Sequence, residues 1–244
     1  MKIAVLNFSG NVGKTTISNC LLMPRLSKPV YIPVETINKN DDDSEGFKGK
    51  QFRELYEVLN MVDNAVVDIG SSNVESLMQV MRQIKGSHDT FDVFIIPVTP
   101  INKQQRDTIS TIEELASIGI SPEKIKLVFN FVEPGDDVSK IFSGIYQYHE
   151  NKKRFTFSND AVIHNNEIFQ LLRESGIKSS IVELSNDKTD YRDKIKSTDD
   201  KNEKLRYSRM ISLVGLAEGI IDELDSVYAV LFPNTKKEKL KQAA

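Results

Sequence analysis

The sequence predicts an α/β fold in which helices cover both faces of a doubly wound, mostly parallel β-sheet. Five short runs of Val, Ile, Leu and Phe show little alternation of apolar and polar residues, as expected of strands that are buried on both faces. Longer segments with apolar residues at helical spacing separate these runs, and this alternating order is typical of parallel sheets. The five runs are residues 2–7, 30–34, 65–69, 93–98 and 126–131.

Four helices are expected between these strands. Ser72 and Glu75 have the spacing of a capping box, in which two side chains accept hydrogen bonds from backbone amides of the first turn, and they predict the start of the third helix. Pro122 marks a turn before the fifth strand. The helices are expected at residues 14–23, 52–61, 74–84 and 104–118.

The pattern becomes weaker after residue 130. A highly charged stretch predicts a loop or an exposed helix. The last helix has apolar residues at helical spacing, which favours packing on the sheet over a role in a membrane. We interpret residues 1–244 as a single domain. The expected elements are strands at 160–164 and 180–184, a short helix at 167–175, the charged stretch at 186–202 and a C-terminal helix at about 203–232.

Composition excludes several classes of protein. The formal net charge of −3 creates no global attraction to nucleic acid. Cys20 is the only cysteine, so the chain can form neither an internal disulfide nor a cysteine-based zinc site. Its apolar runs are shorter than the ~18 residues that cross a bilayer, and the first is too short for a secretory signal. We therefore expect a cytoplasmic protein without stable membrane insertion.

Residues 7–16 predict a phosphate-binding loop between the first strand and the first helix. Gly10 and Gly13 let backbone amides approach phosphate oxygens without a Cβ in the way, and the helix that follows adds its positive end. Lys14 is expected to reach the β- and γ-phosphates and Thr15 to ligate Mg²⁺. Phe8 replaces the first glycine of the standard pattern. The predicted contacts come from Gly10, Asn11, Val12, Gly13, Lys14, Thr15 and Thr16.

Three further residues follow strands. Asp68 ends a buried run, as a Walker-B aspartate does, and is the second candidate for holding Mg²⁺. Glu35 is the candidate to orient the attacking water, or else an ordinary exposed carboxylate. The polar residues 38–50 suit a switch loop. Asn130 ends the fifth strand, where ligands bind in doubly wound folds, and either pairs with adenine or only terminates the strand.

These motifs resemble the ParA/MinD family of deviant Walker-A ATPases. Within it the sequence is most similar to StbB-type proteins of plasmid stability operons, also known as TraL-like conjugal transfer proteins. The resemblance covers roughly residues 1–150. It is carried by residues 2–16, 34–38, 64–70, 86–88, 96–100 and 127–130.

The resemblance implies an ATP-dependent homodimer with weak ATPase activity that acts in plasmid maintenance or conjugative transfer. Its expected partner is a small DNA-binding protein from the same operon, and contact with plasmid DNA would be indirect or non-specific. Two residues depart from the family pattern. Ser9 replaces the signature lysine that reaches across the dimer, and Glu35 replaces an aspartate. We expect slow hydrolysis, with Arg82, Lys103 or Arg106 as substitutes for the missing cation.

Two other functions remain open. The missing lysine suits an adaptor that binds nucleotide without hydrolysing it. A metabolic P-loop enzyme that resembles dethiobiotin synthetase or cobyrinate amidases is the other alternative. The amidases need a glutaminase cysteine, and Cys20 lies inside the first predicted helix.

Overall fold

The structure, a computed structural model, describes residues 1–34, 44–177 and 179–233, with 44–51 described as backbone only. Its six-stranded sheet has the order β2-β3-β1-β4-β5-β6, and every strand pair is parallel. This arrangement confirms the predicted fold class. The strands are β1 (Lys2–Val5), β2 (Val30–Val34), β3 (Ala65–Ile69), β4 (Val93–Val98), β5 (Ile125–Val132) and β6 (Val162–His164).

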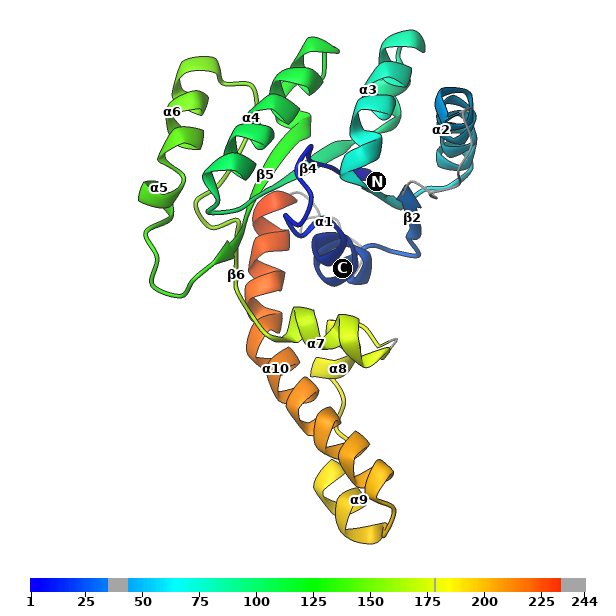
Figure 1. The fold of residues 1–244 in the computed structure, drawn as a ribbon, viewed down its shortest axis with the longest axis vertical. Coiled ribbons are helices and arrows are strands. Elements are labelled where there is room, and N and C mark those ends of the chain that lie inside the picture. The colour runs from blue at the N-terminus through cyan, green and yellow to red at the C-terminus, as the bar shows by residue number, and fades with distance from the viewer. Residues whose placement is uncertain (35–43, 178, 234–244) are drawn as a thin grey trace, which may run out of the picture.

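Helices cover both faces of this sheet, and each face has its own apolar core (Figure 1). Phe52, Leu77 and Ile112 belong to the first core, whereas Ile17 and Leu224 belong to the second. The first face carries α2 (Ser44–Met61), α3 (Val74–Gln83), α4 (Asn102–Ser117), α5 (Val138–Ile141) and α6 (Ser143–Lys152). The second carries α1 (Lys14–Thr16), α7 (Ile168–Ser175), α8 (Ile181–Ser185) and α10 (Lys201–Leu231).

Strand β1 lies at the centre of the sheet, with β3 on one side and β4 on the other. The chain therefore leaves β1 for one half of the sheet and later returns to build the other half. In doubly wound folds, a crevice for ligands forms at the carboxyl ends of the strands at such a reversal point. The predicted phosphate loop follows β1 at this position.

The first predicted helix, at residues 14–23, is α-helical only in α1. It continues as a π-helix, η1 (Ile17–Leu22), and ends as a 3₁₀ turn, η2 (Met23–Arg25). Arg25 donates from Nη1 to the carbonyl oxygens of Cys20 (2.9 Å) and Leu21 (3.0 Å), which satisfies carbonyls at the helix end.

Two local predictions were wrong. Helix α8 (Ile181–Ser185) occupies the segment 180–184 that was predicted as a strand, because Ser180 and Glu183 make a capping box that starts a helix. Ser72 does not cap α3. It lies in a 3₁₀ turn, the N-cap residue is Asn73, and the side-chain amide of Asn73 donates to the carbonyl oxygen of Val34 (3.0 Å).

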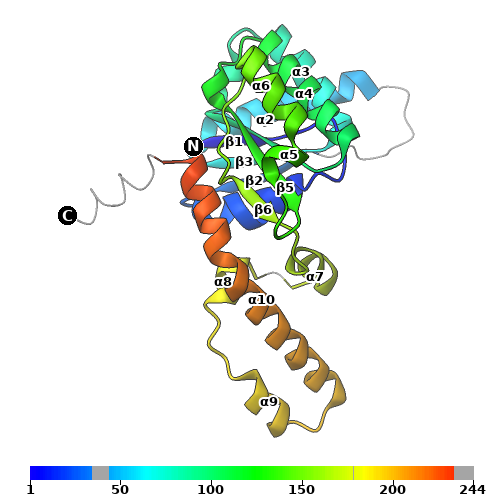
Figure 2. The same cartoon turned by 90° about the vertical axis from the view of Figure 1, so that its left-hand side faces the viewer.

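Helix α10 has two halves with different surroundings. From Leu213 to Leu231 it buries six apolar residues, whereas every residue from 186 to 212 is at least partly exposed. Helix α9 (Tyr191–Ser197) lies beside the exposed half, and both extend beyond the sheet (Figures 1 and 2). Among the described residues, no helix is both long and apolar enough to cross a membrane.

Candidate functional site

The phosphate-loop candidate, residues 10–16, connects β1 to α1 at the carboxyl edge of the sheet. Asn11 (φ 57°) and Gly13 (φ 89°) have left-handed backbone conformations. A Cβ at position 13 would lie 2.0 Å from Nδ2 of Asn130. Glycine is therefore required at this position both by its backbone angle and by the close approach of a side chain from β5.

The ammonium group of Lys14 is held by carbonyl oxygens of the residues just before the loop. It donates to the carbonyl oxygens of Ser9 (2.7 Å) and Asn7 (3.3 Å), and the residue is only 8% exposed. Burial lowers the pKa of Lys14 to about 8, and the charge of Asp68 partly opposes this shift. A partly desolvated cation in a glycine-containing loop suits a ligand with concentrated negative charge, because desolvation strengthens the attraction between charges.

Thr15 and Asp68 meet beside this lysine. The hydroxyl of Thr15 donates to Oδ2 of Asp68 (2.6 Å), and the hydroxyl of Tyr31 donates to the same oxygen (2.9 Å). Asp68 is brought here by the parallel pairing of β1 and β3, which sets it opposite Val5. A hydroxyl and a carboxylate beside a phosphate loop are the oxygen ligands that Mg²⁺ takes when it also binds phosphates.

Helix α4 holds the entrance of the loop. The hydroxyl of Ser9 donates to Oδ2 of Asp107 (2.5 Å), and Nε2 of Gln104 donates to the carbonyl oxygen of Gly10 (3.2 Å). Ser9 is 6% exposed and is paired within its own chain.

A second row of α4 contacts anchors the residues before the loop. Nδ2 of Asn7 donates to Thr108 Oγ1 (2.7 Å) and to the carbonyl oxygen of Pro97 (2.8 Å), while the amide of Phe8 donates to Thr111 Oγ1 (3.1 Å). Sequence reasoning missed this role of α4. The available signal was a set of polar residues at helical spacing on one face of the helix, namely Gln104, Asp107, Thr108 and Thr111.

Asn130 lies against the loop and is 1% exposed. Its Nδ2 donates to the carbonyl oxygen of Val12 (2.9 Å), so one side of its amide is already used by the protein. Its expected pairing with adenine remains a prediction, and the geometry adds a second task, which is to hold the loop beside Gly13.

The remaining candidates lie in different surroundings. Glu35 and residues 38–43 of the predicted switch loop lie outside the described residues. Residues 44–50 form the start of helix α2, so the prediction of a loop was wrong for this part. Arg82 is paired with Glu114 on α4. Lys103 and Arg106 are exposed on α4, close in sequence to the side chains that contact the loop.

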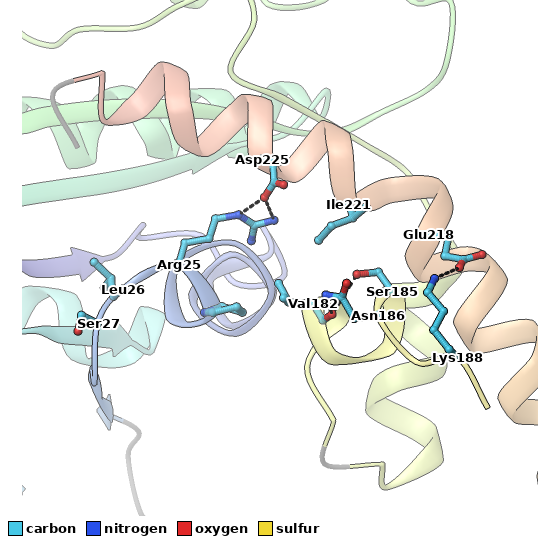
Figure 3. A pocket seen from close by; sticks show the side chains of 11 residues that line it. Arg25, Leu26, Ser27, Val182, Ser185, Asn186, Lys188, Glu218, Ile221 and Asp225 are labelled. Carbon is cyan, nitrogen blue, oxygen red and sulfur yellow. Dashed lines mark hydrogen bonds and ion pairs between the residues drawn. The ribbon is translucent and has the colours of Figure 1, made fainter. Parts of the chain in front are cut away.

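Two cavities lie on the face that carries α8 and α10. A cavity of about 370 Å³ includes Thr15 and Thr16 in its lining. A larger one of about 750 Å³, shown in Figure 3, has no loop residue in its lining. There Arg25 pairs with Asp225 of α10 (2.8 Å) and Lys188 pairs with Glu218 (3.2 Å). The cations of the larger cavity are thus matched by carboxylates.

No protein-family model matches the chain, and no curated protein matches its sequence. Among solved structures, the fold is similar to that of Cyanothece McdA in its apo form, at 14% identity and a TM-score of 0.52 over 89% of this chain and 98% of that one. It is also similar to a single-residue variant of Cyanothece McdA in complex with ATP, at 13% identity and a TM-score of 0.50 over 92% of this chain and 96% of that one. These likenesses show a shared fold.

Proposed function

We propose that this chain binds Mg-ATP at residues 10–16 and acts, in a single domain, as an ATP-dependent switch of the ParA/MinD type with slow hydrolysis. The observation that carries the proposal is the hydrogen bond between Thr15 and Asp68, formed beside the buried ammonium group of Lys14. The shared fold of McdA, one variant of which is described in complex with ATP, supports the choice of nucleotide.

Each residue has a distinct task in this proposal. Lys14 neutralises charge on the β- and γ-phosphates, and the loop amides bind their oxygens. Thr15 and Asp68 hold Mg²⁺, which supplies charge stabilisation at the phosphate oxygens. Glu35 orients the attacking water, and Asn130 contributes to binding the base as well as to holding the loop.

Slow hydrolysis follows from the position of Ser9. A cation supplied to the transferring phosphoryl group accelerates phosphoryl transfer by about 10³–10⁵ in arginine-finger systems. The Ser9 hydroxyl carries no charge and is committed to Asp107. Any cation for the transition state must therefore come from elsewhere, with Lys103 and Arg106 as exposed candidates.

The biological setting is inferred from the resemblance to StbB-type proteins. It supports a cytoplasmic role in plasmid stability, partition or conjugative transfer, with a small DNA-binding protein from the same operon as partner. Contact with plasmid DNA would be indirect or non-specific, and ATP would promote a homodimer.

The test compares Mg-ATP binding by the wild-type protein, Lys14→Ala and a matched control, Lys140→Ala, by isothermal titration calorimetry. Lys140 is a largely exposed lysine on α5. Because charge-assisted hydrogen bonds are worth about 1.5–3 kcal/mol, we expect Lys14→Ala to lose at least about tenfold in affinity and the control to lose none. Equal affinity in all three proteins would remove the proposed site.

Ser9 also favours a second function, that of a nucleotide-binding adaptor without hydrolysis. Phosphate release distinguishes the two. A switch releases phosphate from bound ATP, at a rate raised by DNA and the operon partner, whereas an adaptor binds ATP and releases none under any of these conditions. An amidase is disfavoured, because burial raises the pKa of Cys20 to about 11 and keeps its thiol protonated.

A further inference from the structure

The hydrogen bond from Tyr31 to Asp68 has no role in the function proposed so far. Tyr31 lies on β2, the strand at one edge of the sheet, and its hydroxyl donates to Oδ2 of Asp68 (2.9 Å). The hydroxyl of Thr15, on α1, donates to the same oxygen (2.6 Å). Two hydroxyl groups from different elements therefore converge on one oxygen of a residue that is proposed to hold Mg²⁺.

The register of the strands brings Tyr31 to this position. β2 and β3 are parallel, with Tyr31 opposite Val66 and Pro33 opposite Asp68. Because side chains alternate along a strand, Tyr31 lies on the same face of the sheet as Asp68, two positions before it in the ladder. Val66 belongs to the second core, so this is the face that also carries α1 and Thr15. The hydrogen bond thus joins the edge strand to the proposed metal site.

The orientation of the Asp68 carboxylate depends on such hydrogen-bond partners. The last torsion of an aspartate side chain has broad energy wells, so this torsion alone does not fix the direction of the carboxylate oxygens. Asp68 is 5% exposed, and hydrogen bonds in such surroundings are electrostatically stronger than in water. Two donors on Oδ2 therefore hold the carboxylate in one orientation more firmly than Thr15 would alone.

The contact with Asp68 also sets the direction of the Thr15 hydroxyl. A hydroxyl group has one proton to donate and two lone pairs that accept. Because the proton of Thr15 is directed to Asp68, its lone pairs are directed elsewhere and remain for a metal ion. Partners that orient metal-binding groups raise metal affinity, since the ligands are already in place when the metal arrives.

We infer that Tyr31 is a positioning residue of the magnesium site, whose hydroxyl fixes the carboxylate of Asp68 and, through it, the hydroxyl of Thr15. Tyr31 acts through Asp68 and not by contact with the metal or the nucleotide. This inference rests on the proposed function, since it assumes Mg²⁺ at Thr15 and Asp68. The opposing assignment is a purely structural one, in which the hydrogen bond only attaches β2 to β3.

The first test uses Tyr31→Phe, which removes the hydroxyl and keeps the ring. Calorimetry measures ATP affinity at a series of free Mg²⁺ concentrations and in EDTA. We expect the variant to need about 10–100-fold more free Mg²⁺ for half of the metal-dependent gain in affinity, which is the usual effect of removing such a partner. ATP affinity in EDTA should not change.

The matched control for this test is Tyr191→Phe. It also removes a tyrosine hydroxyl that donates to an aspartate, here Oδ2 of Asp187 (2.6 Å), but at the start of α9. We expect this control to have the Mg²⁺ requirement of the wild-type protein.

The outcomes separate this inference from the proposed function. If Mg²⁺ does not raise the ATP affinity of the wild-type protein, both fail. If Tyr31→Phe has the wild-type Mg²⁺ requirement, the inference is overturned and the proposed magnesium site stands. An equal loss of ATP affinity with Mg²⁺ and in EDTA would also overturn the inference, because a structural defect acts whether or not the metal is present.

A second test needs neither nucleotide nor metal. Urea denaturation compares Tyr31→Phe, Thr15→Val and the double variant. Since both hydroxyls donate to one oxygen of a buried carboxylate, the first substitution leaves that oxygen one of the two donors and the second removes the other. We expect the double variant to lose more stability than the sum of the single losses, because groups that share a partner are not additive.

Thr15→Val combined with Tyr191→Phe is the control for this cycle, and its losses should be additive, since these two hydroxyls donate to different aspartates. Additive losses for Thr15 and Tyr31 as well would show that the two hydroxyls do not act on a common carboxylate, and would overturn the inference.

Discussion

At the scale of single residues, the conformation of the phosphate loop requires glycine at position 13. The effect of replacing Gly13 can be measured as a change in the free energy of unfolding. The residue combines a φ of 89° with a position where a Cβ would lie 2.0 Å from Nδ2 of Asn130. Gly10 has no such constraint, since a Cβ there would meet only Ser71 Oγ, at 3.7 Å.

We therefore predict that Gly13→Ala lowers the free energy of unfolding by about 2 kcal/mol or more, because it adds backbone strain and displaces Asn130. Gly10→Ala, the matched control, should change it by less than about 0.5 kcal/mol. Urea denaturation measures both. Equal stability of the two variants would contradict the described packing of Asn130 on the loop.

Lys14 gives a prediction about pH. Its pKa of about 8 means that the ammonium group is largely neutral in the free folded protein at a pH of about 9. Phosphate groups nearby favour the charged form and raise this pKa, so binding of Mg-ATP at that pH should take up close to one proton. At a pH of about 6 the lysine is already charged and should take up none.

Calorimetry in buffers of different ionisation enthalpy measures this uptake. In the absence of ligand, the lowered pKa of Lys14 also makes the free energy of unfolding depend on pH. Since the unfolded lysine titrates near 10.5, this residue makes the protein more stable as pH rises from about 8 to 10.5. ATP binding without proton uptake at the higher pH would place the ligand away from Lys14.

At the scale of elements, Arg25 joins the helix that follows the loop to α10. The guanidinium group donates to the carbonyl oxygens of Cys20 and Leu21 and pairs with Asp225. The Arg25 side chain is 8% exposed and that of Asp225 is 61% exposed. The two partners should therefore contribute unequally.

Arg25→Ala should cost about 2–3 kcal/mol of stability, because it leaves two carbonyl oxygens without their donor and removes buried side-chain contacts. Asp225→Ala should cost about 1 kcal/mol of stability or less, because an ion pair with a solvent-exposed carboxylate contributes little. Thermal and urea unfolding compare them. Similar losses in both variants would mean that the ion pair, rather than the capping of η1, dominates.

Helix α10 contains glycines that its own fold does not require. A Cβ at Gly215 or Gly219 would have nothing within 4 Å. Gly219→Ala should therefore raise the free energy of unfolding by about 0.5–1 kcal/mol through the lower entropy of the unfolded chain, and Gly215→Ala should do the same. Urea denaturation measures the change. Destabilisation by either change would show that another surface covers the glycine in solution.

At the scale of the whole molecule, the sheet and the distal part of α10 should differ widely in local stability. Strands β1, β3 and β4 are largely buried, whereas residues 186–212 include no buried side chain. Hydrogen exchange followed by mass spectrometry should show the slowest amides in these strands and the fastest in residues 186–212. Equal protection in both regions would show that the exposed segment is covered in solution.

Sequence alone predicted the parts of the molecule that local patterns encode. The buried strands follow from continuous apolar runs, and the loop follows from its glycines and Lys-Thr-Thr. Residues 180–184 were expected to form a strand, whereas the capping box at Ser180 starts a helix. The π-helix of η1 has no recognised sequence signal.

The contacts of the site were less predictable, because they join residues far apart in the chain. Asp107 meets Ser9 only because α4 crosses the loop, and Asn130 reaches Val12 only through the order of the strands. In the sequence, Arg173 looks like an ordinary surface arginine. Only the folded chain brings it into the lining of the same cavity as Thr16. Such pairings come from tertiary structure.

The continuous helix from Lys201 to Leu231 joins a segment that is packed in the second core to one that has no buried residue. At 1.5 Å per residue it is about 46 Å long, and roughly 18 Å of it precedes the first buried residue, Leu213. Because a helix is stiff over this length, its exposed part and the part packed in the second core move as one body. A tilt of the helix near Asp225, which pairs with Arg25, would therefore also move the exposed end at Lys201.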